Sequence, residues 1–188
     1  MHHMKTEVYF IRHAESDISI KNDMERPLTN DGKNNSIKIV EKFNKIIFEN
    51  IYSSPYKRTI QTIEPLAKRQ NKEIIIIDDF RERKIGNVWI DNFEEFSKRQ
   101  WENFNYKLDN GESLFEVQKR NIKNLEKILL KNKGEIIAIG THGTALSTII
   151  NYYNRNFGYE DFKQLVPIMP YIVRFAFEED KNIEICEI

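Results

Sequence analysis

The sequence predicts an α/β fold, a three-layer α/β/α sandwich with a mostly parallel central sheet. Two observations lead to this prediction. Short apolar runs typical of buried strands alternate along the chain with segments of helical periodicity. The chain also has no internal repeat and no linker rich in Pro, Gly or Ser, and its 188 residues are enough to bury a core. We therefore expect a single domain over residues 5–188, preceded by a tag remnant or a frayed end over residues 1–4.

The first strand and the first helix come from residues 7–49. Glu7–Ile11 is a nearly continuous apolar run, which is typical of a strand covered on both faces. A helix is then predicted over 31–49, because apolar residues recur there at spacings of three and four. These residues are Ile37, Val40, Phe43, Ile46 and Ile47.

A second strand, a second helix and a third strand follow. Asn50–Ser53 is predicted to be a strand, and the helix after it is expected to begin at Pro55 with Ser54 as its cap. Its apolar positions are Ile60, Ile63, Leu66 and Ala67. Glu73–Ile77, which contains the longest isoleucine run, predicts a buried third strand.

The second half of the chain continues the alternation. An amphipathic helix is predicted over 112–131, a strand over 135–140 and a further helix over 144–153. Strands over 171–177 and 183–187 complete the fold. The segment between Glu82 and Asn110 carries no regular pattern, and residues 87–110 are interpreted as an inserted, lid-like segment.

Composition excludes several classes of function. The 29 basic and 29 acidic side chains give a formal net charge of zero, which argues against a general nucleic-acid or membrane-surface binder. No apolar run approaches the roughly 18–20 residues that span a bilayer. One thiol, Cys186, cannot form an internal disulfide or a CxxC site, so a reducing cytoplasm is expected. Cys186 itself is interpreted as a small hydrophobic residue at a strand end.

Two of the four histidines carry the functional prediction. His2 and His3 fall in the discounted terminal segment, which leaves His13 and His142 in the body of the chain. His13 follows the first strand and His142 follows the strand over 135–140. Because ligands of open α/β sheets bind outside the carboxyl ends of the strands, both are expected at one rim, with Arg12 and Arg58.

These residue types suit a phosphate ester. A neutral imidazole is a usable nitrogen nucleophile, and guanidinium groups match phosphoryl oxygens with paired donors. Gly143 leaves the backbone open where a helix begins, and helix N-termini favour anions. Glu82 supplies a carboxyl group that can protonate a leaving oxygen.

Six ordered motifs resemble those of the histidine phosphatase superfamily, also called the phosphoglycerate mutase-like family. They run from about residue 5 to the end of the chain. Arg12-His13-Ala14 matches its RHG motif and Thr141-His142-Gly143 its late T-H-G. The other matches are Pro27-Leu28-Thr29 with Gly32; Ser53, Ser54, Pro55, Arg58, Gln61 and Thr62; Phe80-Arg81-Glu82 with Gly86; and Gly111-Glu112-Ser113.

The resemblance implies a phosphoglycerate mutase-like fold and a metal-independent reaction without a cofactor. It implies that His13 accepts the phosphoryl group as a phosphohistidine and that Glu82 acts as general acid and then base. Arg12, Arg58 and His142 would hold the phosphoryl oxygens, with the Gly143 backbone as a further contact. The expected partner is a small phosphate ester, with no nucleic acid or membrane.

Departures from the family pattern favour a phosphatase over a glycolytic mutase. Ala14 replaces the usual glycine. Ser19, which we assign to substrate binding, stands where glycolytic mutases carry asparagine, and Ile18 replaces their tryptophan. Asn87-Val88-Trp89-Ile90 replaces the W-E-G of many phosphatases, so sugar phosphates, a ribazole-like phosphate and phosphohistidine in proteins all stay open as substrates. The motifs do not indicate the oligomeric state.

Several alternatives stay open at this stage. The chain could be a mutase or a phosphate-binding regulatory protein without turnover. Glu82 could belong to a solvated charge run over 81–84, with Glu15 as a rival acid. The aromatic residues of the inserted segment could form a lid or a satellite core; these are Phe93, Phe96, Trp101, Phe104 and Tyr106. A metal site made from His13, His142 and Glu82 is disfavoured, because two arginines would crowd the cation.

Overall fold

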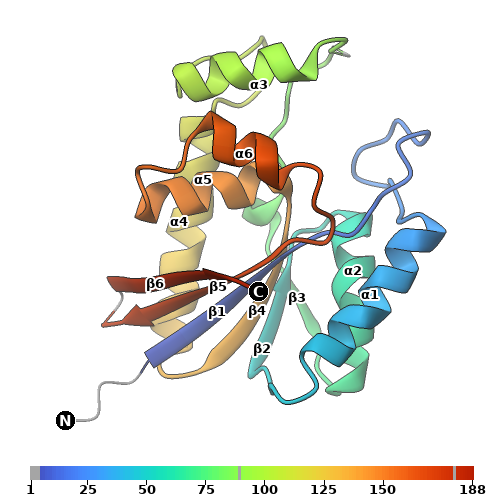
Figure 1. Cartoon of the computed structure of the whole chain (residues 1–188), viewed down its shortest axis with the longest axis vertical. Helices are drawn as coiled ribbons and strands as arrows, with labels where there is room; N and C mark the ends of the chain where they lie inside the picture. Colours follow the sequence, from blue (N-terminus) through green and yellow to red (C-terminus); the bar gives the residue numbers. More distant parts are fainter. Residues whose placement is uncertain (1–4, 89, 180) are drawn as a thin grey trace.

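The computed structural model describes residues 5–88, 90–179 and 181–188, and these form a six-stranded sheet in the order β3-β2-β4-β1-β5-β6. The discounted His2 and His3, and Trp89 of the inserted segment, lie outside the described residues. The strands β1, β2, β3 and β4 run parallel to one another. At one edge, β5 pairs antiparallel with β1, and β6 pairs antiparallel with β5 (Figure 1). The strands are β1 Lys5–Arg12, β2 Asn50–Ser53, β3 Ile74–Ile76, β4 Ile136–Thr141, β5 Ile172–Glu178 and β6 Lys181–Glu187.

Helices cover both faces of the sheet, so the predicted three layers are confirmed (Figure 1). Along β1, Val8 and Phe10 pack in the cluster that contains Leu125 of α4 and Leu146 of α5, whereas Tyr9 and Ile11 face α1 and α2. This alternation buries β1 on both sides, as its apolar run predicts. The helices are α1 Asn30–Lys42, α2 Lys57–Arg69, α3 Phe93–Glu102, α4 Leu114–Lys131, α5 Gly143–Tyr153 and α6 Tyr159–Leu165, with a 3₁₀ turn, η1, at Asp78–Phe80.

The predicted helix over 31–49 is too long at its C-terminal end. α1 ends at Lys42, and Phe43 is its C-cap. Ile37 and Ile47 are exposed, at 57% and 76% of their surface, so they are not part of the buried face. The chain turns early because Phe43 and Phe48 both pack edge-on against the ring of Tyr9, at centroid distances of 5.3 and 5.6 Å. That aromatic contact draws residues 43–48 off the helix axis and into the core.

Two smaller predictions are also wrong. Ser54 does not cap α2, whose N-cap is Tyr56 and whose cap position makes no side-chain hydrogen bond. Ile74–Ile77 is not fully buried, because β3 is an edge strand with no neighbour on one side and Ile76 is exposed. Cys186 lies near the end of the opposite edge strand, β6, as predicted, and its side chain is exposed. Edge strands keep one flank open to water, and hydropathy alone does not distinguish them from central strands.

Two helices were absent from the sequence prediction. α3 lies in the segment predicted to be irregular, where the Asn92 side chain accepts a hydrogen bond from the Glu95 amide and caps it. α6 is seven residues long, too short to show periodicity. The two helices pack together above the sheet (Figure 1). Trp101 of α3 contacts Phe157 and Phe162 at ring-centroid distances of 5.9 and 5.6 Å, as in a satellite core, and the lid interpretation stays a prediction.

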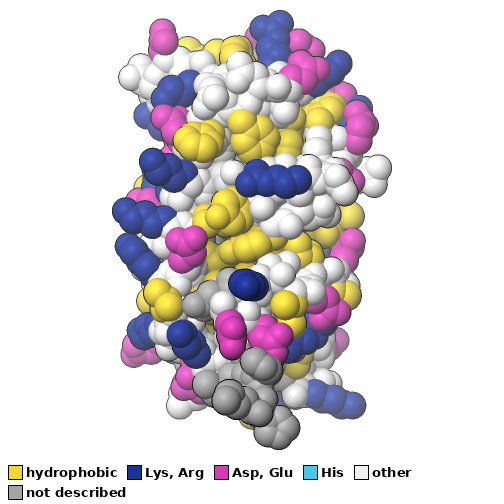
Figure 2. Space-filling view, turned by 90° about the vertical axis from the view of Figure 1, so that its left-hand side faces the viewer, with side chains coloured by type: hydrophobic (Ala, Val, Ile, Leu, Met, Phe, Trp, Pro, Cys, Tyr) yellow, Lys and Arg dark blue, Asp and Glu magenta, His cyan; other side chains and the backbone are white. Residues whose placement is uncertain are grey.

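Charges of both signs are interspersed on the face of the molecule at the left of Figure 1, where a band of hydrophobic side chains runs between them (Figure 2). None of the helices among the described residues is long and apolar enough to cross a bilayer.

We expect side-chain truncation in helix α4 to lower the free energy of unfolding only on its buried face. Leu125→Ala removes a side chain with no exposed surface and should lower the free energy of unfolding by about 3 kcal/mol. Leu130→Ala, five residues along the same helix, removes a side chain that is 59% exposed, and should change it by less than about 0.5 kcal/mol. Urea unfolding of the two variants measures the difference, and equal effects would contradict the assigned core.

Candidate active site

The ends of two adjacent parallel strands bring the two predicted histidines together. Arg12, the last residue of β1, is in register with Thr141, the last residue of β4. The amide of His13 donates to the carbonyl of Thr141 at 3.0 Å, and His142 follows directly. The two imidazole centroids are 5.3 Å apart. The backbone pairing of β1 with β4 therefore sets the spacing of the two rings.

His13 has one ring nitrogen fixed and the other available. Its Nδ1 lies 2.8 Å from the carbonyl oxygen of Ala14. A carbonyl only accepts, so Nδ1 carries the hydrogen in the neutral ring and Nε2 keeps its lone pair. Burial lowers the pKa of His13 well below its usual 6.5, and the charges of Arg58 and Arg12 lower it further. His13 is thus a neutral imidazole at physiological pH, with an unprotonated Nε2, which is the form that a nitrogen nucleophile requires.

Arg12 is held by the C-terminal end of α6. Its Nη1 donates to the carbonyl oxygens of Leu165, Val166 and Ile168 at 3.0, 2.7 and 2.9 Å. Its Nε is buried and has no hydrogen-bond partner among the described residues. Burial lowers the pKa of Arg12 to about 10, so the guanidinium stays charged at neutral pH. The unpaired Nε–H is available to an incoming anion.

Gly143 makes room for that guanidinium. A Cβ added at Gly143 would lie 3.1 Å from Nε and 3.2 Å from Cζ of Arg12. Any side chain here would press on a guanidinium whose Nη1 is already fixed by three carbonyls. The structure therefore gives Gly143 a packing requirement in addition to the predicted backbone contact.

Arg58 lies on the first turn of α2 and is nearly fully buried. Its guanidinium lies 4.9 Å from the ring centre of Tyr56, and its Nη1 lies 3.1 Å from Oδ1 of Asp23. The same carboxylate oxygen is 3.1 Å from Nη1 of Arg26. Burial lowers the pKa of Arg58, whereas the charges of Asp23 and Glu82 raise it.

Sequence reasoning missed Tyr56, Asp23 and Arg26. The charge of Arg26 contributes to the lowered pKa of His13, which places a third arginine near the cluster. Arg26 directly precedes the Pro27-Leu28-Thr29 motif, and its charge next to that motif was the available signal. Tyr56 stands inside the matched Ser-Ser-Pro block, but at a position the motif leaves free.

Glu82 occupies the N-terminus of α5. Its Oε2 accepts from the amide of Thr144 at 3.0 Å, and its Oε1 accepts from those of Ala145 and Arg83 at 3.1 and 2.8 Å. The sequence argument assigned this helix N-terminus to the substrate's phosphate, and the structure gives Thr144 and Ala145 to the Glu82 carboxylate. Three backbone donors orient the carboxylate and leave Oε2, with a single donor, the less occupied oxygen.

The two alternatives to Glu82 do not fit the structure well. The 81–84 segment is not a solvated charge run, because Arg83 is buried, with Nη1 donating to Gln100 at 2.6 Å. Its guanidinium also lies 5.0 Å from the ring centre of Phe96 on α3. The rival acid Glu15 is exposed and accepts a hydrogen bond from the Thr29 hydroxyl at 2.8 Å.

His142 is fully buried, and its Nε2 lies 2.7 Å from Oγ of Ser54 and 3.2 Å from Oγ1 of Thr59. Its Nδ1 is buried without a hydrogen-bond partner among the described residues. Burial lowers the pKa of His142 well below 6.5, and the charges of Arg58 and His13 add to this effect. The ring of Tyr56 packs edge-on against it at 4.9 Å. His142 is therefore a second neutral imidazole with one free nitrogen.

Ser19 is not brought into this cluster by any described contact. It is exposed, and its amide and hydroxyl both bond to Oδ1 of Asp17, at 3.0 and 2.6 Å. Its assignment to substrate binding stays a sequence-based prediction.

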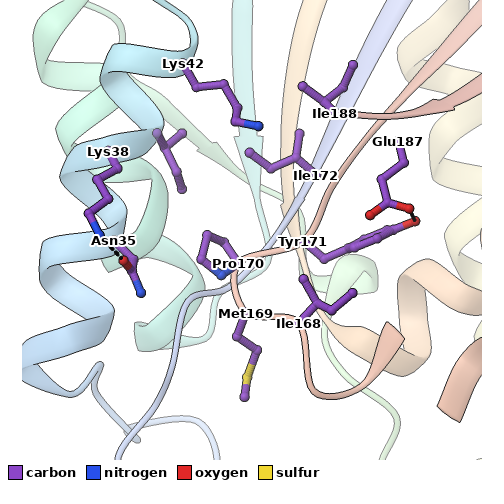
Figure 3. A pocket seen from close by; sticks show the side chains of 11 residues that line it. Asn35, Lys38, Lys42, Ile168, Met169, Pro170, Tyr171, Ile172, Glu187 and Ile188 are labelled. Carbon is purple, nitrogen blue, oxygen red and sulfur yellow. Dashed lines mark hydrogen bonds between the residues drawn. The ribbon is translucent and has the colours of Figure 1, made fainter. Parts of the chain in front are cut away.

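A cavity of about 290 Å³ opens elsewhere, between α1 and the chain around β5 and β6 (Figure 3). Lys38 and Lys42 line it on one side and Tyr171 and Glu187 on the other, and none of the predicted site residues lines it. Within the described residues, no group of three or more His, Cys, Asp or Glu side chains is arranged to hold a metal ion.

Comparison with known proteins identifies the family. The model of the histidine phosphatase superfamily (branch 1) matches residues 8–182. The chain belongs to this superfamily. Its fold is phosphoglycerate mutase-like, as predicted from the motifs. The chain is 29% identical over 162 residues to a metal-independent phosphoserine phosphatase of Arabidopsis thaliana, covering 77% of this chain and 67% of that protein.

Two further proteins extend the comparison. Phosphoglycerate mutase-like protein 4 of Arabidopsis thaliana is 27% identical over 158 residues, covering 76% of this chain and 69% of that protein. The structure of the phosphoserine phosphatase of Entamoeba histolytica in complex with phosphoserine superposes with a TM-score of 0.79 at 21% identity, covering 95% and 94% of the two chains. At that identity the superposition shows the shared fold only.

The buried neutral histidines make stability depend on pH. Both pKa values are lowered on folding, so below pH 6.5 the unfolded chain binds more protons than the native state, and stability falls as pH falls towards the folded pKa values. Each imidazole should contribute up to about 1.4 kcal/mol per pH unit in this range. Urea unfolding between pH 7.5 and 5 measures the slope. The slope should be smaller in His142→Asn, and equal slopes in the two proteins would contradict the assignment.

Proposed function

We propose that the protein is a phosphatase that hydrolyses a small phosphomonoester through a phosphohistidine on His13. The observation that carries this proposal is the state of His13, a buried neutral imidazole with a free Nε2 lone pair between the cations of Arg12 and Arg58. The arginines attract a phosphate dianion and stabilise the charge on its equatorial oxygens during transfer. Superfamily membership and the phosphatases among the similar proteins support the same conclusion.

The first half of the reaction transfers the phosphoryl group to His13. Nε2 attacks phosphorus, the bond from phosphorus to the ester oxygen breaks, and protonated Glu82 gives its proton to the leaving alkoxide. Oε2 is the oxygen we assign to this proton, because Oε1 already accepts two backbone hydrogen bonds. The unpaired Nε–H of Arg12 and the guanidinium of Arg58 hold the transferring group.

The second half restores the enzyme. The Glu82 carboxylate removes a proton from a water molecule, the resulting hydroxide attacks phosphorus, and the bond from Nε2 to phosphorus breaks. The products are inorganic phosphate, neutral His13 and protonated Glu82.

Loss of the nucleophile is the direct test. His13→Ala should lower turnover of 4-nitrophenyl phosphate by at least about 10³-fold, because it removes the nucleophile of the proposed reaction. In the wild-type protein, rapid quenching during turnover of ³²P-labelled substrate should trap a label that is stable to base and released by acid. A wild-type rate on a broad panel no higher than that of His13→Ala would contradict the proposal.

The general acid is tested through the leaving group. Glu82→Gln should slow release of an alkyl alcohol by about 10²–10⁴-fold and the first release of 4-nitrophenolate much less, because nitrophenolate leaves without a proton. Stopped-flow traces of the variant should then show a nitrophenolate burst followed by slow turnover. Glu15→Gln is the matched control and should behave like the wild-type protein. The reverse result would make Glu15 the acid.

The second candidate is a phosphoglycerate mutase, which the similarity to phosphoglycerate mutase-like protein 4 favours. Supplying 3-phosphoglycerate and following both phosphate release and isomerisation separates the two functions. Phosphate release without isomerisation supports the phosphatase, and isomerisation without release supports the mutase.

A further inference from the structure

Two buried hydroxyl groups, those of Ser54 and Thr59, lie within hydrogen-bond distance of Nε2 of His142. Ser54 Oγ lies 2.7 Å and Thr59 Oγ1 lies 3.2 Å from Nε2, and the two oxygens are 3.3 Å apart. The amide of Tyr56 also donates to Ser54 Oγ, at 3.2 Å. Ser54, Thr59 and His142 have no exposed surface. Every hydrogen in this cluster therefore needs an acceptor within it.

Counting hydrogens decides which ring nitrogen of His142 is protonated. If Nε2 carried the hydrogen, Ser54 Oγ would accept from both Nε2 and Tyr56 and would donate to Thr59. The Thr59 hydroxyl hydrogen would then have no acceptor, because its contacts in the described part of the chain are confined to Ser54 and His142. An unsatisfied buried hydroxyl is destabilising.

The other tautomer satisfies both hydroxyl groups and the Nε2 lone pair, and leaves the ring hydrogen on Nδ1 without an acceptor among the described residues. Because a hydroxyl hydrogen can rotate, the 3.3 Å contact between the two hydroxyls can also run from Thr59 to Ser54 Oγ. Ser54 then donates to Nε2 of His142, and the Tyr56 amide fills the second lone pair of Ser54. The ring hydrogen is then on Nδ1, the atom that is buried without a partner.

We propose that Ser54, supported by Thr59, is a positioning residue that holds His142 in the Nδ1–H tautomer and so makes it a hydrogen-bond donor to the transferring phosphoryl group. The proposal rests on the proposed phosphatase function and deepens it. With its Nδ1 unprotonated, a neutral His142 would present a lone pair to a phosphoryl oxygen and repel it. The hydroxyl pair thereby decides whether the second histidine aids the transfer or opposes it.

The tautomer itself can be observed in the wild-type protein. In protein labelled with ¹⁵N-histidine, two-bond ¹H–¹⁵N correlation spectra at pH 7.5 should show for His142 a pyrrole-type shift at Nδ1 and a pyridine-type shift at Nε2. His142→Asn identifies the signals by their loss. A pyridine-type Nδ1 or a protonated ring in the wild-type protein would overturn the proposal.

Variants test the role of the hydroxyl. Ser54→Ala should change the spectrum towards the Nε2–H tautomer. It should also lower the affinity for vanadate and kcat for 4-nitrophenyl phosphate, both by about 10–100-fold. Ser54→Thr restores a hydroxyl and should recover most of the loss. Ser53→Ala removes the neighbouring buried hydroxyl, which donates to the Ser54 carbonyl and not to His142, and is the matched control. Wild-type spectra and kinetics in Ser54→Ala would refute the positioning role.

Two safeguards keep these results separable. If Ser54→Ala does not fold, the near-isosteric Thr59→Val removes the Thr59 hydroxyl. The proposal then requires changes in the spectrum, in the affinity for vanadate and in kcat that are smaller than for Ser54→Ala and in the same direction. If the wild-type protein shows the Nδ1–H signature and binds vanadate but hydrolyses no phosphate ester, the tautomer assignment stands and the proposed phosphatase function fails.

Discussion

The parallel pairing of β1 with β4 is the contact on which the whole candidate site depends. It places the residues after Arg12 and Thr141 side by side at the carboxyl rim, and the bond from the His13 amide to the Thr141 carbonyl continues the ladder beyond both strands. Because β1 and β4 are central strands covered on both faces, this rim is held by the two largest hydrophobic clusters of the molecule. The imidazole spacing is thus a property of the sheet and not of a loop.

The second constraint is electrostatic. Arg12 and Arg58 are buried cations, and a buried charge is costly unless polar groups surround it. Three carbonyls at the C-terminal end of α6 surround Arg12, and the Asp23 carboxylate pairs with Arg58. These carbonyls do not use every donor of Arg12, since its Nε stays unpaired among the described residues. The formal net charge of zero therefore coexists with a local cluster of cations that a phosphoryl group would complete.

The sequence predicted the parts of this arrangement that follow from strand order and motif position. Arg12, His13, Arg58 and His142 meet at one rim because each directly follows a strand or opens the helix after it. Contacts that depend on side-chain packing were not predictable in the same way. The end of α1 is decided by the packing of Phe43 and Phe48 on Tyr9. Asp23 is paired with its near neighbour Arg26 and with Arg58, which is distant in sequence. Hydrophobic periodicity contains neither kind of information.

The assignment of the α5 N-terminus shows how such a contact changes a mechanism. An open helix N-terminus suits any anion, and the sequence argument gave it to the substrate. In the structure the Glu82 carboxylate accepts from Thr144 and Ala145, so α5 orients the proposed acid while its preceding residue, His142, faces the proposed nucleophile. One strand-to-helix junction thereby positions both the proposed proton carrier and the proposed phosphoryl ligand.

The two histidines then differ only in which nitrogen is left free. A backbone carbonyl takes the Nδ1 hydrogen of His13 and exposes a lone pair, whereas the hydroxyls of Ser54 and Thr59 occupy Nε2 of His142 and leave Nδ1 unpaired. In the proposed reaction, the same neutral tautomer would make one ring a nucleophile and the other a donor. Burial next to arginines keeps both rings neutral. The hydrogen-bond partner of each ring then determines which of its nitrogens is left for the substrate.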